Sequence, residues 1–248
     1  MIEIKIDDRV YTCEKGEYLL DIAKRNHIDI PTLCHHPGMD GLASCRLCIV
    51  EVVERGWSKI VVSCVYPVDK PIEVYTNSER VRRDRAAVLM LLALRAPESP
   101  EIKDLCEKYG ALDGSRFAAI ENEKCVMCGL CAQACGAIGT GAIATVGRGT
   151  EKKIATPYDE PSDVCIGCLS CAKVCPTGAI SFTENPTDRE IWGRRFPLVF
   201  CQKCGAPLGT YAEVQYAAKK AGHPGETLCT HCRQAAMSDA LAHTYGEV

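Results

Sequence analysis

Cysteine is the residue type in this sequence with the greatest capacity for chemistry. The chain has 248 residues and 18 cysteines, and all but Cys13 and Cys106 fall into groups with short, regular spacings. No apolar stretch typical of a secretory signal follows Met1, which predicts a cytoplasmic protein. In a reducing compartment, clustered cysteines are metal ligands rather than disulfides. Cys13 and Cys106 belong to no motif, so we expect them to be small buried hydrophobic residues.

Two similar runs of four cysteines form the most specific pattern. Each has the spacing C-x2-C-x2-C-x3-C, and the repeat of the run indicates an internal duplication. In two-cluster ferredoxins, three cysteines of such a run bind one cubane and the fourth binds the other cluster. The predicted ligands of one 4Fe–4S cluster are Cys125, Cys128, Cys131 and Cys175. Those of the other are Cys165, Cys168, Cys171 and Cys135. Because each run supplies a ligand to both clusters, the two clusters are predicted to lie close together, as electron hopping requires. The alternative for these eight cysteines is a pair of zinc sites.

A separate group of four cysteines lies nearer the N-terminus, at Cys34, Cys45, Cys48 and Cys64. Four thiolates suit an iron–sulfide core, so this group predicts a 2Fe–2S cluster. A structural or zinc role for the four is the alternative. His35 and His36 could in principle replace thiolates, but with four cysteines available we expect them to have surface or hydrogen-bonding roles.

The segments around these cysteines resemble a known domain. Pro31 to Cys34 and Cys45 to Glu51 are similar to the N-terminal 2Fe–2S domain in the large iron–sulfur subunit of respiratory complex I. The same domain occurs in NAD-linked hydrogenases and formate dehydrogenases. For residues 1–78 the resemblance implies a β-grasp ferredoxin fold. The alternation of Ile2, Ile4 and Ile6 agrees with a strand there.

Residues 115–190 resemble the dicluster ferredoxin domain of iron-only hydrogenases and NAD-linked formate dehydrogenases. Gly136 replaces the proline that usually follows such a run, and Gly139 to Ile143 mirrors Pro176 to Ile180. The loose G-x-G-x-x-A match that begins at Gly139 is not a dinucleotide site, because no strand–turn–helix unit surrounds it.

Relatives of this kind usually carry a further cluster, held by one His and three Cys, between the two domains. Residues 79–115 contain no His and only Cys106, so that cluster is predicted absent and residues 79–114 are predicted to form a helical linker. One helix is expected from 79 to 96, ended by Pro97 and Pro100, and another from 101 to 109. The basic run of the first helix, residues 80–85, is expected to be a solvated face, and its apolar part, 86–94, a contact with another subunit.

Residues 191–248 carry two isolated C-x2-C pairs, Cys201, Cys204, Cys229 and Cys232. The pattern resembles a stretched four-cysteine zinc ribbon, and we expect a structural zinc ion braced between the pairs, with a helix in the intervening segment. A third 4Fe–4S cluster is the main alternative. His223 and His231 could each replace a cysteine as a ligand, but four thiolates already complete the set, so we do not expect them to bind the metal.

Composition limits the function classes. The net charge of −3 disfavours nucleic-acid binding, and the longest apolar run has nine residues where a membrane span needs about 20. The predicted fold class is α+β: a 2Fe–2S β-grasp domain (1–78), a helical linker (79–114), a bacterial-type dicluster 4Fe–4S domain (115–190) and a zinc-ribbon-like module (191–248).

The family resemblance implies an electron-transfer subunit of an NAD(P)H-linked oxidoreductase, with no catalytic residue of its own. The partners it implies are a flavoprotein that oxidises NAD(P)H and a hydrogenase, formate dehydrogenase or other catalytic subunit; a soluble ferredoxin is a further one. Such clusters exchange single electrons while the flavin handles hydride. A non-redox zinc or iron–sulfur scaffold or sensor is the alternative.

Overall fold

The structure is a computed structural model that describes residues 1–222, 225 and 227–246. The chain divides into two compact units. Unit 1 comprises residues 1–134, 145–154 and 173–179, and unit 2 comprises 135–144, 155–172 and 180–248. Within the described part of the chain, no helix combines the length and the apolar character that a membrane crossing needs.

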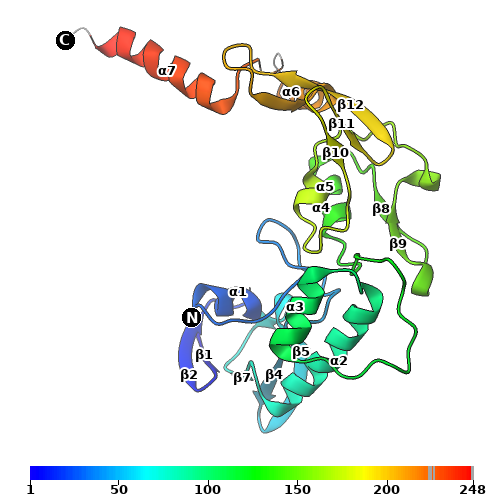
Figure 1. Cartoon of the computed structure of the whole chain (residues 1–248). Helices are drawn as coiled ribbons and strands as arrows, with labels where there is room; N and C mark the ends of the chain where they lie inside the picture. The colour runs from blue at the N-terminus through cyan, green and yellow to red at the C-terminus, as the bar shows by residue number, and fades with distance from the viewer. Residues whose placement is uncertain (223–224, 226, 247–248) are drawn as a thin grey trace. The chain divides into compact units, whose positions relative to one another are not determined.

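Unit 1 is built on a five-stranded sheet in the order β2-β1-β7-β4-β5 (Figure 1). Its strands are β1 (Ile2–Ile6), β2 (Arg9–Cys13), β4 (Ile49–Glu54), β5 (Trp57–Val62) and β7 (Glu73–Tyr75). β1 runs parallel to β7, whereas β1–β2, β4–β5 and β4–β7 are antiparallel. This arrangement confirms the β-grasp prediction.

The core of the sheet follows from the alternation in the sequence. Ile4 and Ile6 are 2% and 1% exposed and pack against the fully buried Leu19, Leu20 and Ile22. Those three residues lie on helix α1 (Leu19–Arg25), which is the first helix of the chain. A small sheet of β3 (Glu17–Tyr18) and β6 (Pro67–Val68) and the 3-10 turn η1 (Ser63–Val65) complete this part. Cys13 belongs to the core at 3% exposure, as predicted.

Two helices follow the sheet, α2 (Glu79–Arg95) and α3 (Pro100–Tyr109). The hydroxyl oxygens of Ser78 and Ser99 accept hydrogen bonds from the N–H groups three residues further on, at 3.2 and 3.3 Å, and so cap the two N-termini. Proline at the first position of α3 is favourable because its missing N–H would be unpaired there. The predicted helices of the linker are therefore confirmed.

Two expectations for α2 are wrong. The basic run is not uniformly solvated, because Arg85 is only 3% exposed and points into the β-grasp sheet, whereas Arg82 is exposed. The apolar part is not free for another subunit either: Leu89 and Leu92 are buried in unit 1, and Leu91, 57% exposed, faces outward. Arg85 and the two leucines are buried because α2 packs within unit 1.

Unit 2 contains a four-stranded antiparallel sheet in the order β10-β11-β12-β13, which the sequence analysis did not predict. Its strands are β10 (Thr183–Glu184), β11 (Asp188–Ile191), β12 (Arg194–Phe200) and β13 (Pro207–Thr210). Trp192 and Gly193, at φ of 54° and 71°, form the tight turn between β11 and β12. Two residues with positive φ suit such a hairpin. The predicted boundary at residue 190 thus falls inside β11.

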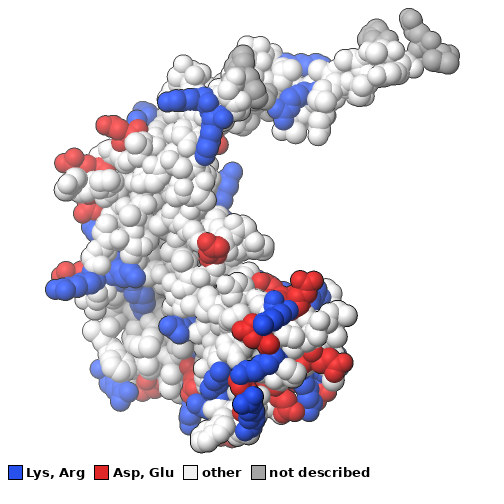
Figure 2. Space-filling view, turned by 180° about the vertical axis from the view of Figure 1, so that it is seen from behind, with Lys and Arg blue, Asp and Glu red and all other residues white. Residues whose placement is uncertain are grey.

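Helix α6 (Tyr211–Ala221) follows the sheet, with a capping box between Thr210 and Glu213, and α7 (Thr230–Tyr245) is the last helix of the described chain. The remaining elements are α4 (Leu130–Ile138), β8 (Ala144–Val146), η2 (Gly149–Glu151), β9 (Lys153–Ala155), η3 (Pro157–Asp159) and α5 (Ser170–Lys173). On the face shown in Figure 2, the basic side chains of the described residues lie among acidic ones rather than in a continuous basic patch.

Candidate iron–sulfur and metal sites

The four cysteines predicted to hold the 2Fe–2S cluster lie in unit 1, and all are 3% exposed or less. Cys48 directly precedes β4 and Cys64 lies in η1 directly after β5. The antiparallel β4–β5 pairing brings these two together, and the Ser63 hydroxyl donates to the Cys48 carbonyl at 2.7 Å. Cys34 and Cys45 come from the loop between α1 and β4, where the Cys45 N–H donates to the Cys34 sulfur at 3.4 Å.

The thiols of this group interact as two hydrogen-bonded pairs. A hydrogen bond from the Cys34 thiol lowers the pKa of Cys45 to about 6, and one from Cys64 lowers the pKa of Cys48 to about 7. The partner thiols Cys34 and Cys64 correspondingly keep their protons, with raised pKa values. Two thiol pairs match the two irons of a 2Fe–2S core, each of which needs two thiolates. The residues therefore fit this cofactor.

The neighbouring histidines make other contacts. The His35 Nδ1 lies 2.7 Å from the Lys24 Nζ, and its Nε2 lies 3.6 Å from the Asp21 carboxylate, both on α1. The His36 Nδ1 accepts a hydrogen bond from the Gly38 N–H at 3.2 Å. Both rings thus take hydrogen-bonding roles outside the thiol group.

The cysteines predicted for the first 4Fe–4S cluster also lie together in unit 1. Cys125 and Cys128 occupy the loop before α4, Cys131 is on its first turn, and Cys175 returns to them from the second run. The charge of Cys175 acts on each of the other three thiols. Burial in apolar surroundings raises the pKa of Cys128 to about 11 and of Cys131 to about 12. Such thiols become thiolates when a metal displaces their protons.

The cysteines predicted for the second 4Fe–4S cluster lie in unit 2 and line one cavity: Cys135, Cys165, Cys168 and Cys171. Cys135 therefore lies with the second run and not with its own, as the exchanged-ligand motif predicts. Burial raises the pKa of Cys165 and Cys171. The buried indole N–H of Trp192 also faces this cavity and is directed at the Cys171 sulfur, where it partly opposes the rise in the pKa of that thiol that burial causes. A buried donor beside four thiols fits a bound cluster whose sulfurs accept the hydrogen bond.

The internal repeat has a structural basis at the fourth cysteine of each run. The N–H of Ala142 donates to the Cys135 sulfur at 3.2 Å, and the N–H of Ala179 donates to the Cys175 sulfur at 3.3 Å. A threonine hydroxyl approaches the same sulfur in both copies, at 3.2 Å for Thr140. The two copies of the Thr-Gly-Ala-Ile repeat thus hold the sulfur of the fourth cysteine in the same way.

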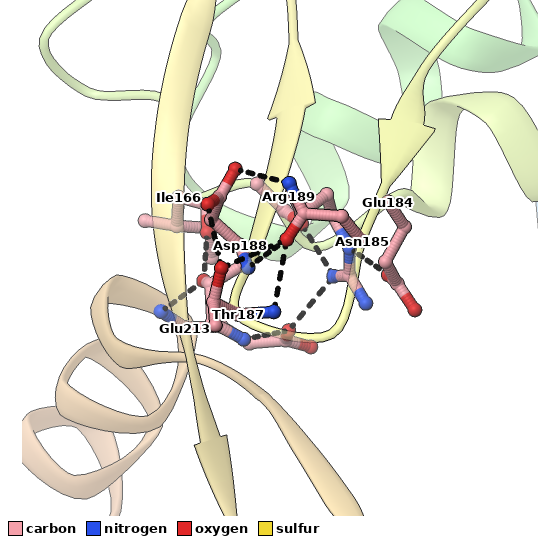
Figure 3. Close-up of polar contacts among 9 residues, drawn as sticks. Ile166, Glu184, Asn185, Thr187, Asp188, Arg189 and Glu213 are labelled. Carbon is pink, nitrogen blue, oxygen red and sulfur yellow. Dashed lines mark hydrogen bonds and ion pairs between the residues drawn. The ribbon is translucent and has the colours of Figure 1, made fainter.

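The new sheet of unit 2 holds the loop that carries the second run. Three consecutive carbonyls, those of Cys165, Ile166 and Gly167, accept hydrogen bonds from Arg194, Thr210 and Arg189 respectively. Figure 3 shows Arg189 of β11 among its carboxylate partners, Glu184 at 2.6 Å and Glu213 at 3.7 Å. The sequence alone does not reveal these side chains, because they lie beyond the last cysteine of the run and follow no ligand spacing.

Glycine is the one residue type that fits at position 167. Its φ is +68°, and a Cβ there would lie 2.7 Å from the Phe196 ring and 3.1 Å from Thr210. The ligand loop therefore packs directly on β12 and β13. A side chain at residue 167 would separate the loop from the sheet that orients it.

The 2Fe–2S and first 4Fe–4S groups of unit 1 share one apolar cluster. Its buried members include ligand candidates from both groups and the side chains between them: Leu33, Cys34, Cys45, Leu47, Leu89, Leu92, Val126, Cys128 and Leu130. The charge of Cys45 acts on Cys128 across this cluster. Leu89 and Leu92 of α2 are also buried in this cluster. Cys106 lies half-buried at the edge of the same cluster.

Of the four cysteine groups, the C-terminal one has its sulfur atoms closest together. The sulfur atoms of Cys201, Cys204, Cys229 and Cys232 all lie within 4.8 Å of one another, and those of Cys204 and Cys229 are 3.6 Å apart. Gly205, at φ of 72°, allows the tight turn after the first pair. Hydrogen bonding by the Cys229 backbone lowers the pKa of Cys201 to about 6. These four thiols fit a single metal ion; His231 is exposed on α7, and His223 lies outside the described residues.

Comparisons with known proteins match both halves of the iron–sulfur part. Residues 1–79 match a family described as a 2Fe–2S iron–sulfur cluster binding domain, and residues 118–182 match a 4Fe–4S dicluster domain. The chain is 33% identical over 73% of its length to the HndD subunit of an NADP-reducing hydrogenase from Solidesulfovibrio fructosivorans. It is 28% identical over 83% of its length to an NADH-quinone oxidoreductase subunit from Rhizobium meliloti (strain 1021).

The chain is much shorter than these relatives, covering 36% of the first and 27% of the second. It also resembles a chain in the crystal structure of an NAD+-reducing [NiFe]-hydrogenase in the H2-reduced state. That likeness has a TM-score of 0.61 at 25% identity and covers 72% of this chain and 86% of the other. The matched share of this chain is thus larger than either iron–sulfur domain alone.

Proposed function

We propose that this chain, which carries a 2Fe–2S cluster binding domain and a 4Fe–4S dicluster domain, is the electron-transfer subunit of a multi-subunit NAD(P)H-linked oxidoreductase. Bound clusters of these types would take up and pass on single electrons. The described residues supply the ligands, the hydrogen bonds to sulfur and the dry surroundings. The relatives that support the proposal are named as subunits of such complexes.

The observation that carries the proposal is the shared apolar cluster of unit 1. It includes Cys34, Cys45 and Cys128 together with buried apolar side chains from both cysteine groups and from α2. A scaffold or sensor has no need for two redox ligand sets on one water-excluding core. An electron path needs this arrangement, because packing without water keeps neighbouring redox centres close and limits the solvent reorganisation that accompanies electron transfer. We infer that electrons pass directly between the Cys34 group and the Cys125 group.

The fourth-ligand exchange extends this path to the second 4Fe–4S group. Helix α4 carries Cys131 of one group and Cys135 of the other, so a single helix contributes to both. We expect a flavoprotein that oxidises NAD(P)H at one end of the path and a hydrogenase, formate dehydrogenase, other catalytic subunit or ferredoxin at the other. The chain would work in the cytoplasm.

We further propose that the C-terminal group binds zinc. Zinc–thiolate bonds of about 2.3 Å in a tetrahedron place sulfurs about 3.8 Å apart, close to the 3.6 Å between Cys204 and Cys229. A cubane is a larger core and needs its thiolates further apart. A closed zinc site with four thiolate ligands is redox-silent, so its role here would be to hold β12, β13 and α7 together.

Metal analysis of the anaerobically purified chain tests both proposals. One 2Fe–2S and two 4Fe–4S clusters predict about ten Fe, and the closed site predicts one Zn. The reduced protein should show EPR signals of both cluster types, and NADH should reduce it only when a flavoprotein subunit is added. Iron well below this count, or cluster signals that no reductant changes, would contradict the electron-transfer role. About fourteen Fe and no Zn would contradict the zinc site.

A further inference from the structure

Arg85 is the one charged side chain that is buried in the described part of the chain. It lies on α2, and only 3% of it is exposed. Transfer of a charge out of water is unfavourable unless partners compensate it. Its environment therefore needs a physical explanation.

The contacts of Arg85 surround one ligand candidate of the 2Fe–2S site. Its Nε donates to the Leu47 carbonyl at 3.3 Å, and its Nη2 donates to the Ile49 carbonyl at 2.9 Å and to the Thr76 carbonyl at 3.2 Å. Leu47 and Ile49 are the residues on either side of Cys48. Each carbonyl that accepts from the guanidinium shares a peptide group with the next N–H, so the hydrogen bonds polarise the N–H groups of Cys48 and Val50.

No carboxylate forms an ion pair with this cation within the residues that the structure describes. Asp29, whose charge acts on Arg85, binds the Lys108 ammonium at 2.9 Å and the Tyr109 hydroxyl at 3.2 Å instead. The Tyr109 ring lies 5.5 Å from the guanidinium carbon. Burial lowers the pKa of Arg85, and the charges of Tyr109, Asp29 and Cys48 oppose that shift. A group of four thiolates around iron is anionic, so it would add a strong counter-charge on the Cys48 side of the guanidinium.

We propose that Arg85 is the internal counter-ion of the 2Fe–2S site and raises its reduction potential. The inference rests on the proposed function, because it needs a 2Fe–2S cluster at Cys34, Cys45, Cys48 and Cys64. Reduction adds one electron and therefore one negative charge to the cluster, with no bond made or broken. A fixed, poorly hydrated cation beside Cys48 stabilises that added charge. Arg85 thus makes this site a better electron acceptor.

Potentiometric EPR titration of the full chain with dithionite tests the proposal. In R85M, at a fixed potential, the ratio of reduced to oxidised 2Fe–2S cluster should fall at least tenfold, which is about 59 mV for a one-electron couple. R82M is the matched control: Arg82 lies on the same helix and is exposed, so its loss should change the ratio less than about threefold. Equal ratios in R85M and wild type, with normal cluster content, would overturn the inference.

A second variant covers the case in which R85M fails to fold or to bind the cluster. Y109E places a carboxylate beside Arg85 and neutralises the cation without removing its hydrogen bonds, and it should lower the ratio in the same direction. Y109Q, which loses the same hydroxyl and has the size of the glutamate without its charge, is the matched control and should change the ratio much less. An unchanged ratio in Y109E would then overturn the counter-ion role. Absence of any 2Fe–2S signal in the wild-type chain would instead contradict the proposed function, so the two failures are distinguishable.

Discussion

At the scale of single residues, the structure adds to each cysteine motif the groups that orient it. The C-x2-C spacings predicted which thiols belong together, and their positions in the two units agree with the exchanged-ligand pattern. The spacing could not predict that Trp192 directs a buried N–H at the second 4Fe–4S group, or that Arg85 is buried beside Cys48. Both depend on which surface of a distant element meets the ligand loop, and no local pattern encodes that.

Gly167 gives the sharpest test at this scale. We expect G167A to lose most of the second 4Fe–4S cluster, because the new Cβ would overlap the Phe196 ring and displace the loop of Cys165 and Cys168. Iron content should fall from about ten towards about six per chain. G149A is the control: Gly149 has a similar φ of +59° but open space around a Cβ, so it should retain its iron. Full iron in G167A would show that the sheet does not fix this loop.

At the scale of elements, helix α2 is the part whose role changes most between sequence and structure. Its limits were predicted from the prolines that follow it and from its composition. The sequence did not show that it would be a core element, because its basic and apolar residues suggested a solvated face and an external contact. In the structure its N-terminal half contacts the β-grasp sheet through Arg85, and its C-terminal half contributes Leu89 and Leu92 to the apolar cluster.

We expect L89A to destabilise unit 1 by about 2–5 kcal/mol, the usual cost of a Leu-to-Ala truncation at a fully buried site. L91A, on the exposed side of the same helix, should change the free energy of unfolding by less than about 0.5 kcal/mol. Anaerobic denaturant titration, followed by cluster absorbance and by far-UV circular dichroism, measures both. Equal effects of the two variants would show that α2 is a linker after all.

At the scale of the whole chain, the cysteine groups predicted the order of the modules better than their limits. The alternating isoleucines and the domain resemblance predicted the β-grasp part correctly. The sheet of residues 183–210 was missed because three of its strands are short, and because β12 begins with two arginines and contains a proline, so it shows no apolar alternation.

Two truncated chains test where the dicluster part ends and the C-terminal cysteine module begins. A chain of residues 1–222 keeps the β10–β13 sheet and α6 but loses Cys229 and Cys232, so we expect about ten Fe and no Zn. A chain of residues 1–190 also loses Trp192, Arg194 and Thr210, and we expect about six Fe because the second 4Fe–4S group loses its support. Metal analysis of both chains measures this. About ten Fe in the shorter chain would place the module boundary at residue 190.

Helix α7 begins at the C-terminal cysteine group. The Cys229 sulfur accepts the N–H of Cys232 at 3.4 Å at the helix N-terminus, and Met237, Leu241 and Tyr245 farther along are 61%, 56% and 74% exposed. A solitary helix of this length is marginal in water, because its first turn must be fixed before any further hydrogen bond repays the lost entropy. A metal ion bound by Cys229 and Cys232 fixes that turn in advance. The zinc ion that we propose there would act as the nucleus of α7, and its occupancy would decide whether the chain presents an ordered helix or an unfolded tail.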